Sequence, residues 1–480
     1  MGVLAGTIND LTHEHDRFEA LSESPIVLRS PICYVSPTHS QTQRMCGHLA
    51  IFALKETSVM QIPGKHRSWI SSVTLAAAAI AMAIVIALTM LGARTAQSQT
   101  FTVLHTFTGG TDGELPEAGL TLDAAGNLYG TASAGGSSGS GTVYKLTHRG
   151  TGWTFSLLYS FAGGNDGATP IARVIFGPNG TLYGTTEYGG NCASTCGTVF
   201  NLVPPSTVCK AVLCPWDEKV IYRFQGGVGD GSRPGYGDLV FDRAGSLYGT
   251  TILSGANSSG IVYELTPSSG SWTENILYNM TSDSGVYPYS GVIFDHAGNL
   301  YGTAFEGGPD SIYGTVYELT PSGSGWTENT LYNFQEVTDG SSPYGGVIFD
   351  SSGNLYGTTS NRGPDGAGTV FKLTPSNGTY TFTVLHSFAG NDGPYGGLTM
   401  DAAGNLYGTT YGDGVHDYGN VFELSPSNGG WSYTDLYDFT GGNDGGYPFG
   451  SVAIDADGNL YGTTAYFGTH GYGVVWEITP

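Results

Sequence analysis

The chain has 480 residues, of which 76 are glycine, 30 are tyrosine and only 12% are charged. Abundant glycine and aromatic residues without a collagen period favour an all-β protein rich in tight turns, and an apolar fraction of 40% excludes a disordered chain. The formal net charge of −23 argues against nucleic acid and anionic lipid as partners, since an acidic surface repels phosphate groups, and it leaves cations, neutral glycans and basic proteins open.

The N-terminal hundred residues carry the pattern of an export signal. Residues 1–59 show no repeat, and we interpret them as an unstructured tail or as the product of a mis-called start codon. Residues 60–98 combine a positive start, the apolar run Val73–Leu91 and small residues at the end, as a signal peptide does. The run has 19 residues, so an uncleaved signal anchor, an apolar helix crossing the membrane through residues 70–92, is the alternative. Either outcome delivers the rest of the chain outside the cytoplasm, to the extracellular space, the periplasm or the cell surface.

The tetrapeptide Leu-Tyr-Gly-Thr organises the remainder of the chain. Its seven copies begin at Leu128, Leu182, Leu247, Leu300, Leu355, Leu406 and Leu460. A period near fifty residues is typical of propellers and solenoids. The fifth copy indicates four strands, at 345–350, 355–359, 368–375 and 380–388, separated by turn signals. Four-stranded sheets repeated radially make a β-propeller, so seven copies predict seven blades.

The two ends of the repeat region are complementary. Residues 101–107 match the fourth strand of a repeat without the three before it, and residues 473–479 match the third strand without a fourth after it. We predict that the N-terminal strand completes the C-terminal blade, which hides the free edges of an open array. Residues 101–480 are therefore expected to form one closed, monomeric, all-β seven-bladed β-propeller with four strands per blade.

The repeated apolar residues have a structural interpretation. Leu and Tyr of each tetrapeptide point to opposite faces of a strand that packs on both sides, and the Gly lets another backbone or ring approach closely. Five tryptophans open the fourth strands, where we expect them to pack between blades. They are Trp153, Trp216, Trp272, Trp326 and Trp431.

These residues resemble the GloVer-type tandem repeat of exported bacterial proteins. The matching elements are D-x-x-G-N-L-Y-G-T, as in residues 401–409, then G-T-V-[YF]-x-L-[TS]-P, and a G-G-N-D-G turn. The resemblance covers residues 101–480. It implies a secreted, propeller-like protein of undefined activity.

All four cysteines of the repeat region lie in the second copy. Cys192 and Cys196 precede a predicted strand at residues 197–203, and Cys209 and Cys214 follow it. That strand would hold the two loops roughly 20 Å apart, whereas a disulfide needs Cα atoms within about 7 Å. We therefore predict two local disulfides, Cys192–Cys196 and Cys209–Cys214, in an oxidising compartment, rather than a four-cysteine zinc site.

Two sets of aspartates recur. One set lies in the connections between repeats and comprises Asp112, Asp166, Asp230, Asp283, Asp339, Asp392 and Asp444. The other set ends the first strand of a repeat and comprises Asp123, Asp242, Asp295, Asp350, Asp401 and Asp455. Asp before Gly is a standard turn residue, but carboxylates converging near a central channel could bind Ca²⁺ or sugar hydroxyls. We take the first set as candidate ligand or metal residues and the second as hairpin-turn residues.

Nothing in the sequence makes a positive case for catalysis. There is no Gly-x-Ser-x-Gly elbow, no His-Glu-x-x-His and no phosphate loop. We expect a binding or adhesion module for an extracellular glycan, a protein or a divalent cation, with Ca²⁺ as the one cofactor considered. The alternative is a glycan-active hydrolase or lyase that uses aspartates of the connections between blades. A structural envelope component without a saturable ligand is the third hypothesis.

Overall fold

The computed structural model describes residues 99–480, apart from 151, 191, 193–194, 206–214, 309–311, 324 and 336. The chain divides into two units, Met1–Thr89 and Met90–Pro480, and every described residue belongs to the second. The predicted tail at 1–59 and the predicted signal at 60–98, with its apolar helix, lie outside the described residues. Within the described part, no helix is long and apolar enough to span a bilayer.

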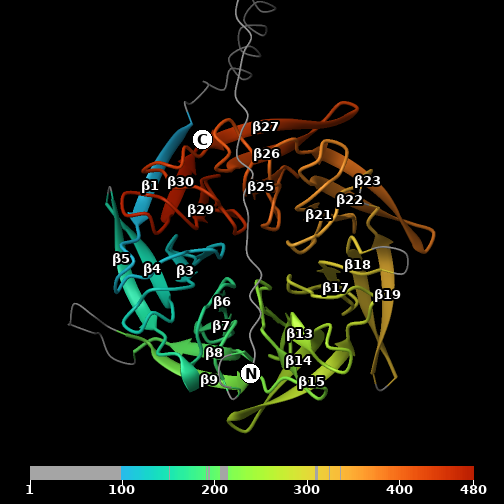
Figure 1. Cartoon of the computed structure of the whole chain (residues 1–480), viewed down its shortest axis with the longest axis horizontal. Coiled ribbons are helices and arrows are strands. Elements are labelled where there is room, and N and C mark those ends of the chain that lie inside the picture. The colour runs from blue at the N-terminus through green and yellow to red at the C-terminus, as the bar shows by residue number, and fades with distance from the viewer. Residues whose placement is uncertain are drawn as a thin grey trace, which may run out of the picture. The chain divides into compact units, whose positions relative to one another are not determined.

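Seven four-stranded antiparallel sheets surround one axis, and we call them blades 1 to 7 in chain order (Figure 1). In each blade the strands run from the axis outward as positions A, B, C and D. The predicted all-β propeller with seven blades is confirmed. The one helical element among the described residues is a short 3-10 turn, η1 (Gly164–Asp166).

The first three blades establish the order of strands from A to D. Blade 1 contains β2 (Thr121–Leu122), β3 (Leu128–Ala132), β4 (Thr142–Arg149) and β5 (Gly152–Ser160). Blade 2 contains β6 (Ile175–Phe176), β7 (Leu182–Thr186), β8 (Thr198–Val203) and β9 (Asp217–Arg223). Blade 3 contains β11 (Val240–Phe241), β12 (Leu247–Thr251), β14 (Ile261–Ser268) and β15 (Ser271–Asn279), with a small extra pair β10 (Gly231–Ser232) and β13 (Leu253–Ser254) beside it.

The later blades repeat this order. Blade 4 contains β16 (Ile293–Phe294), β17 (Leu300–Ala304), β18 (Thr315–Ser322) and β19 (Gly325–Asn333). Blade 5 contains β20 (Ile348–Phe349), β21 (Leu355–Thr359), β22 (Thr369–Ser376) and β23 (Thr379–Ser387). Blade 6 contains β24 (Thr399–Met400), β25 (Leu406–Thr410), β26 (Asn420–Ser427) and β27 (Gly430–Asp438). Blade 7 contains β28 (Ala453–Ile454), β29 (Leu460–Thr464), β30 (Val474–Thr479) and β1 (Thr100–Thr106).

Blade 7 closes the ring because it takes its D strand from the other end of the repeat region. β1 pairs antiparallel with β30, from Thr100 opposite Thr479 to Thr106 opposite Val474. In Figure 1 the blue β1 lies beside the red β30. The predicted closure by residues 101–107 is therefore confirmed, and the sheet edge that an open ring would leave there is paired.

The turn between strands A and B is built by one aspartate in six blades. In blade 5, Oδ1 of Asp350 accepts the backbone N–H groups of Ser352 (2.8 Å) and Asn354 (2.9 Å), and its Oδ2 accepts the hydroxyl of Tyr356 (3.1 Å). Burial alone would raise the pKa of Asp350, but these hydrogen bonds bring it below its ordinary value. The same bonds recur at Asp123, Asp242, Asp295, Asp401 and Asp455, which confirms the turn interpretation of the second aspartate set.

The glycine of each tetrapeptide makes room for a ring. A Cβ atom placed on Gly357 would lie 2.6 Å from Cζ of Phe371, which sits on strand C of the same blade. Every blade has an equivalent aromatic ring over its glycine, and in blade 7 Trp476 covers Gly462 in this way. A side chain here would displace a fully buried ring, which explains the glycine despite its cost in strand propensity.

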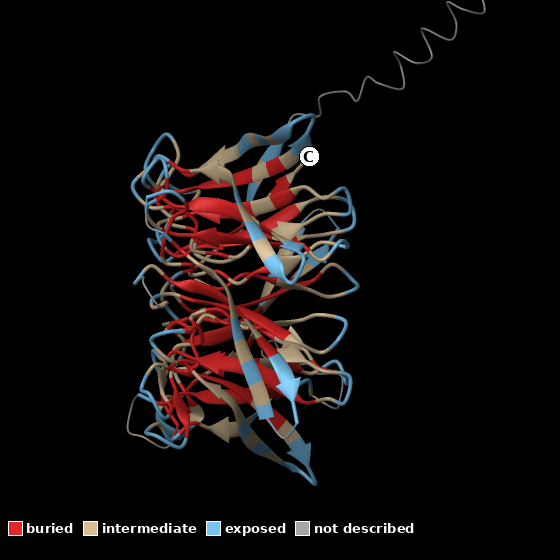
Figure 2. Cartoon of the chain, turned by 90° about the vertical axis from the view of Figure 1, so that its right-hand side faces the viewer, coloured by how far each residue is buried: buried red, intermediate tan, exposed pale blue. Residues whose placement is uncertain are grey.

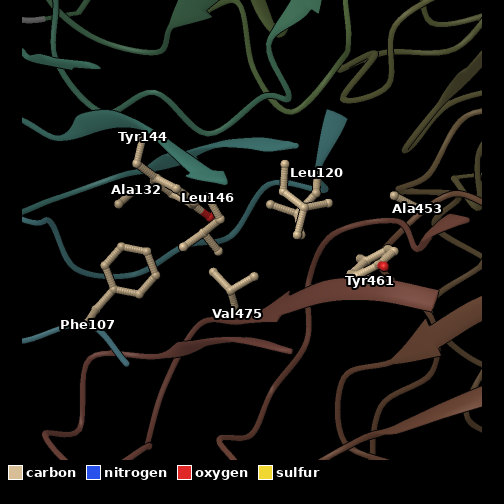
Figure 3. Packing of buried hydrophobic residues seen from close by; sticks show 9 residues of the cluster. Phe107, Leu120, Ala132, Tyr144, Leu146, Ala453, Tyr461 and Val475 are labelled. Atoms are coloured by element: carbon tan, nitrogen blue, oxygen red, sulfur yellow. The ribbon is translucent and has the colours of Figure 1, made fainter. Parts of the chain in front are cut away.

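The core lies between blades rather than within them. One cluster joins Tyr144 and Leu146 of blade 1 to Phe107, Tyr461 and Val475 of blade 7 (Figure 3). Figure 2 shows that buried residues gather on the inner strands, whereas the outer D strands alternate between exposed and half-buried positions. Each blade therefore depends on its neighbours for burial of its apolar faces.

The tryptophans seal the outer part of the same interfaces. The ring centroid of Trp153 lies 5.8 Å from that of Tyr461, and Trp431 lies 5.9 Å from Tyr356, both edge to face. Trp216 and Trp272 contact the tetrapeptide tyrosine of the preceding blade in the same manner. The packing interpretation of these four residues is confirmed.

The threonine of the tetrapeptide joins neighbouring blades by a hydrogen bond. Its Oγ1 donates to a backbone carbonyl just before strand A of the next blade. The pairs are Thr131 to Ala172 (3.1 Å), Thr250 to Ser290 (2.7 Å), Thr303 to Gly345 (3.1 Å), Thr358 to Gly396 (3.1 Å), Thr409 to Gly450 (3.1 Å) and Thr463 to Ala118 (2.8 Å). The last pair connects blade 7 to blade 1 across the closure.

Blade 2 departs from this pattern. The hydroxyl of Thr185 is buried and has no hydrogen-bond partner among the described residues. Blade 3 carries one more residue than the others between its proline, Pro234, and strand A. Here Arg173 bridges the blades instead, with its Nε 2.9 Å from Oδ2 of Asp238 and its backbone N–H donating to Oδ1 at 3.2 Å.

We expect Thr358→Val to lower the free energy of unfolding by about 1–3 kcal/mol, because it removes a buried donor while keeping the shape of the side chain. Thr185→Val is the matched control: it removes a buried hydroxyl that has no partner in the described part of the chain, so it should be neutral or slightly stabilising. Urea unfolding of both variants checks this. Equal losses of stability would contradict the assigned role of the threonine bond.

Candidate functional site

The predicted disulfide between Cys192 and Cys196 is present. It lies in the connection between strands B and C of blade 2, with Cα atoms 5.8 Å apart. Cys196 is buried in the interface between blades 2 and 3. The second predicted pair, Cys209 and Cys214, lies outside the described residues. The bridge between Cys192 and Cys196 therefore staples an inserted loop and presents no exposed thiol.

Five aspartates of the first set close their own connections. Asp444 accepts the backbone N–H of Thr440 (2.8 Å) and the hydroxyl of Tyr437 (3.1 Å), and Asp339 accepts the N–H of Gln335 (2.8 Å) and the hydroxyl of Tyr332. Equivalent bonds are made by Asp112, Asp166 and Asp230. Their carboxylates are occupied with local turns. Across the described residues, no three His, Cys, Asp or Glu side chains gather into a group that could hold a metal ion.

Asp283 does not occupy the same structural position as these five. Its carboxylate is exposed, and among the described residues it accepts a hydrogen bond only from the hydroxyl of Ser282, at 3.4 Å. The neighbouring Ser284 is buried and takes over the turn, since its hydroxyl accepts the backbone N–H of Thr281 at 3.1 Å. The sequence-based grouping is therefore shifted by one residue in this connection, where a serine replaces the aspartate before Gly285.

Asp392 does not occupy the turn position either, because the connection that contains it is shorter than the others. Six positions separate Phe388 from Pro394, whereas nine separate Phe439 from Pro448 in the next connection. The backbone carbonyl of Asp392 accepts the N–H of Gly412 (3.0 Å), as Gly446 does from Tyr466 (3.2 Å) in the next blade. Asp392 is thus the counterpart of Gly446, not of Asp444. The shortened connection has moved its carboxylate away from the turn.

The shortened connection borders a recess of about 600 Å³ between blades 6 and 7. We call it the blade 6–7 recess. It lies where the connections between blades meet the connections between strands B and C. Its lining residues are Asn391, Asp392, Tyr411, Gly412, Asp417, Tyr447, Tyr466, Phe467 and Gly471.

Aromatic rings form the walls of the blade 6–7 recess. Tyr411 and Tyr447 stack, with ring centroids 4.7 Å apart and planes 25° apart. Phe467 and Tyr466 lie 5.7 Å and 6.0 Å from Tyr447. Tyr466 is 39% exposed, so its ring is open to solvent. Burial raises the pKa of the Asp392 carboxyl, and no described residue donates a hydrogen bond to it.

A second aromatic group lies near the axis. The residue after the proline of the connection is aromatic in five blades and contributes Tyr236, Tyr289, Tyr344, Tyr395 and Phe449 (one residue later in blade 3). Ring centroids are 4.5 Å apart for Tyr289 and Tyr344 and 5.1 Å apart for Tyr236 and Phe449. Four of these rings line an axial cavity of about 280 Å³. The axial cavity is therefore smaller than the blade 6–7 recess.

Blades 1 and 2 place charge beside the aromatic group. Burial raises the pKa of Glu117, which lines the axial cavity, to about 7. Glu187 is buried and pairs with Arg233, whose Nε lies 2.8 Å from Oε1 of the glutamate. The Arg233 guanidinium also lies over the ring of Tyr188, 5.2 Å from its centroid. Arg233 therefore supplies a counter-charge for the buried Glu187.

The outer strands hold a carboxyl group that responds to pH. Glu218 of β9 lies near Asp166, which accepts the hydroxyl of Tyr159 at 2.7 Å. Burial, and then the nearby negative charge of Asp166, raise the pKa of Glu218 to about 7 from an ordinary value of 4.5. Between those two values the folded protein holds a proton that the unfolded chain releases, so stability falls as the pH rises.

We predict that the melting temperature decreases as the pH rises from 5 to 8, and that Glu218→Gln makes this decrease shallower. The variant should match the wild-type protein at pH 5 and melt roughly 2 °C higher at pH 8, where it avoids a buried charge. Calorimetric scans at both pH values measure the difference. A variant with an unchanged pH profile would show that Glu218 is charged throughout.

Comparison with known proteins identifies the family of the chain. A search of curated proteins finds no match. Among solved structures, the chain is similar to the extracellular domain of a protein from B. thetaiotaomicron assigned as a one component system, with a TM-score of 0.45 and 11% identity over 79% of this chain. The chain spans only 40% of the length of that solved domain. The model of the Gloeobacter/Verrucomicrobia repeat matches residues 91–219, 215–396 and 310–480. These matches cover most of the sequence, and the chain therefore belongs to the Gloeobacter/Verrucomicrobia repeat family.

Proposed function

We propose that the protein is an exported binding module and that its ligand is an extracellular glycan held in the blade 6–7 recess. The observation that carries the proposal is the recess itself, in which four aromatic rings and three polar side chains surround about 600 Å³. The connection that borders the recess is the shortest of the seven, with six positions from Phe388 to Pro394. Ligand sites are commonly concave, largely apolar and supplied with a few polar groups.

The chemistry of the lining suits a sugar. A pyranose ring has an apolar face of C–H groups, which packs against a flat aromatic ring, and a rim of hydroxyls that need hydrogen-bond partners. Tyr411, Tyr447 and Tyr466 supply rigid amphipathic surfaces, and each ring loses little conformational entropy on binding. Asn391 and Asp392 supply acceptors for hydroxyl protons, and the amide of Asn391 can also donate.

Two features of the chain support action outside the cytoplasm. The predicted export signal at residues 60–98 precedes the propeller directly. The bridge between Cys192 and Cys196 is stable in an oxidising compartment and uncommon in the cytosol. A glycan of the envelope or of the surroundings is accessible to a protein in that location.

Glycan hydrolysis is the second candidate, favoured by one observation. Asp392 and Asp417 both line the recess, and glycoside hydrolysis usually employs two carboxyl groups, one of which has a raised pKa. Incubation with soluble chitin oligomers or β-glucans and an assay for new reducing ends separates the two candidates. Product formation that Asp392→Asn abolishes would establish a hydrolase, and binding without product would establish a binding module.

We expect Tyr466→Ala to weaken binding of chitin hexasaccharide about tenfold, or ~1.4 kcal/mol, because it removes an exposed wall of the recess. Tyr472→Ala is the matched control: Tyr472 is 38% exposed, close to the 39% of Tyr466, and lies in the same connection but does not line the recess. Isothermal titration against a panel of chitin, β-glucan and xylan oligomers measures the affinities. Equal effects of the two substitutions, or no saturable binding to any oligomer, would overturn the proposal.

A further inference from the structure

We propose that the blade 6–7 recess selects glycans that carry free amino groups, so that its preferred ligand is a polymer of amino sugars rather than a neutral or acidic one. This inference rests on the proposed glycan-binding function and names its substrate class. It follows from the charge, the rings and the unusual position of Asp392.

The charge of the recess has one sign. Its ionisable lining carboxylates are Asp392 and Asp417, and no lysine or arginine is among the described residues that line it. Asp413 adds a further carboxylate beside the shortened connection, since a Cβ placed on Gly390 would lie 2.4 Å from its Oδ1. A neutral sugar gains nothing from this field and an acidic sugar is repelled by it, whereas an ammonium group is attracted.

The aromatic walls of the recess also favour a ligand that carries an ammonium group. An ammonium group within about 6 Å of a ring centroid is attracted to the negative face of the ring. Tyr447 lies at the centre of the group, within 6.0 Å of Tyr411, Tyr466 and Phe467. A protonated amine in the recess would therefore meet ring faces and carboxylates together, while the C–H face of the sugar packs on the remaining ring.

Asp392 provides the sharpest evidence. The turn aspartates of five other connections receive backbone and side-chain hydrogen bonds, but no described residue donates to the Asp392 carboxylate. The backbone is held in place there, since the N–H of Gly412 donates to the carbonyl of Asp392 and the N–H of Asn391 donates to the carbonyl of Gly412. A half-buried carboxylate without a partner costs free energy in the free protein. A cationic ligand supplies the missing counter-charge and removes this cost, so it should bind more tightly than a neutral ligand.

The test compares two hexasaccharides with one backbone: the glucosamine hexamer, which carries free amines, and the N-acetylglucosamine hexamer, which carries none. Titration calorimetry on the full chain at pH 6 and low salt should give a Kd about three- to tenfold lower for the glucosamine hexamer. The preference should shrink in 1 M NaCl, where charges are screened.

Two variants locate the preference. Asp392→Asn should remove the preference, so that the two hexamers bind with similar affinities, and a thermal melt like that of the wild-type protein shows that the variant is folded. Asp283→Asn removes the same charge from another connection on an exposed side chain, and it should keep the preference.

The outcomes separate this inference from the function on which it rests. Equal affinities for the two hexamers, or tighter binding of the acetylated one, would refute amine selection and leave glycan binding intact. If Asp283→Asn also loses the preference, the preference depends on the net charge of the protein and not on the recess, and the inference is refuted. If neither hexamer binds the wild-type protein, and β-glucan and xylan oligomers do not bind either, both amine selection and the proposed glycan-binding function are refuted.

Discussion

At several blade junctions the innermost segments meet backbone to backbone, which allows the sheets to approach one another closely around the axis. A Cβ on Gly450 would lie 2.3 Å from the nitrogen of Gly119, and one on Gly345 would lie 2.7 Å from the carbonyl oxygen of Gly396. These positions therefore exclude any side chain. The tetrapeptide threonines then join six of the seven segments to the blade before them. Thr463 completes the circuit at Ala118 although 345 positions separate the two in the chain.

Because the same threonine hydrogen bond recurs around the ring, the blades that depart from the repeat can be identified and their departures explained. The added residue in blade 3 leaves Thr185 without a described partner, and the ion pair between Arg173 and Asp238 holds the two blades together instead. The shortened connection before blade 6 has the opposite consequence, because it frees Asp392 from a turn and opens a recess. The repeat supplies stability, and the departures from it supply a surface that differs from blade to blade.

Local patterns predict the fold well because each blade is specified within its own fifty residues. The strand order, the closure, the aspartate turns and the bridge between Cys192 and Cys196 all follow from short-range sequence. The recess cannot be predicted from short-range sequence, because Tyr411, Tyr447 and Tyr466 come from three separate loops that only the closed ring brings together. The Asn-Asp-Gly context of Asp392 wrongly groups it with the turn aspartates. The short spacing to Pro394 is the signal in the sequence that reveals its true position.

The central claim is that one junction, rather than seven equivalent ones, binds the ligand. Hydrogen exchange of the backbone, measured with and without saturating chitin or glucosamine hexasaccharide, tests it most directly. We predict protection confined to residues 391–393, 411–417, 446–447 and 466–471, with one ligand per chain. Protection spread evenly over the connections of all seven blades, or located on the turns between strands A and B, would contradict it.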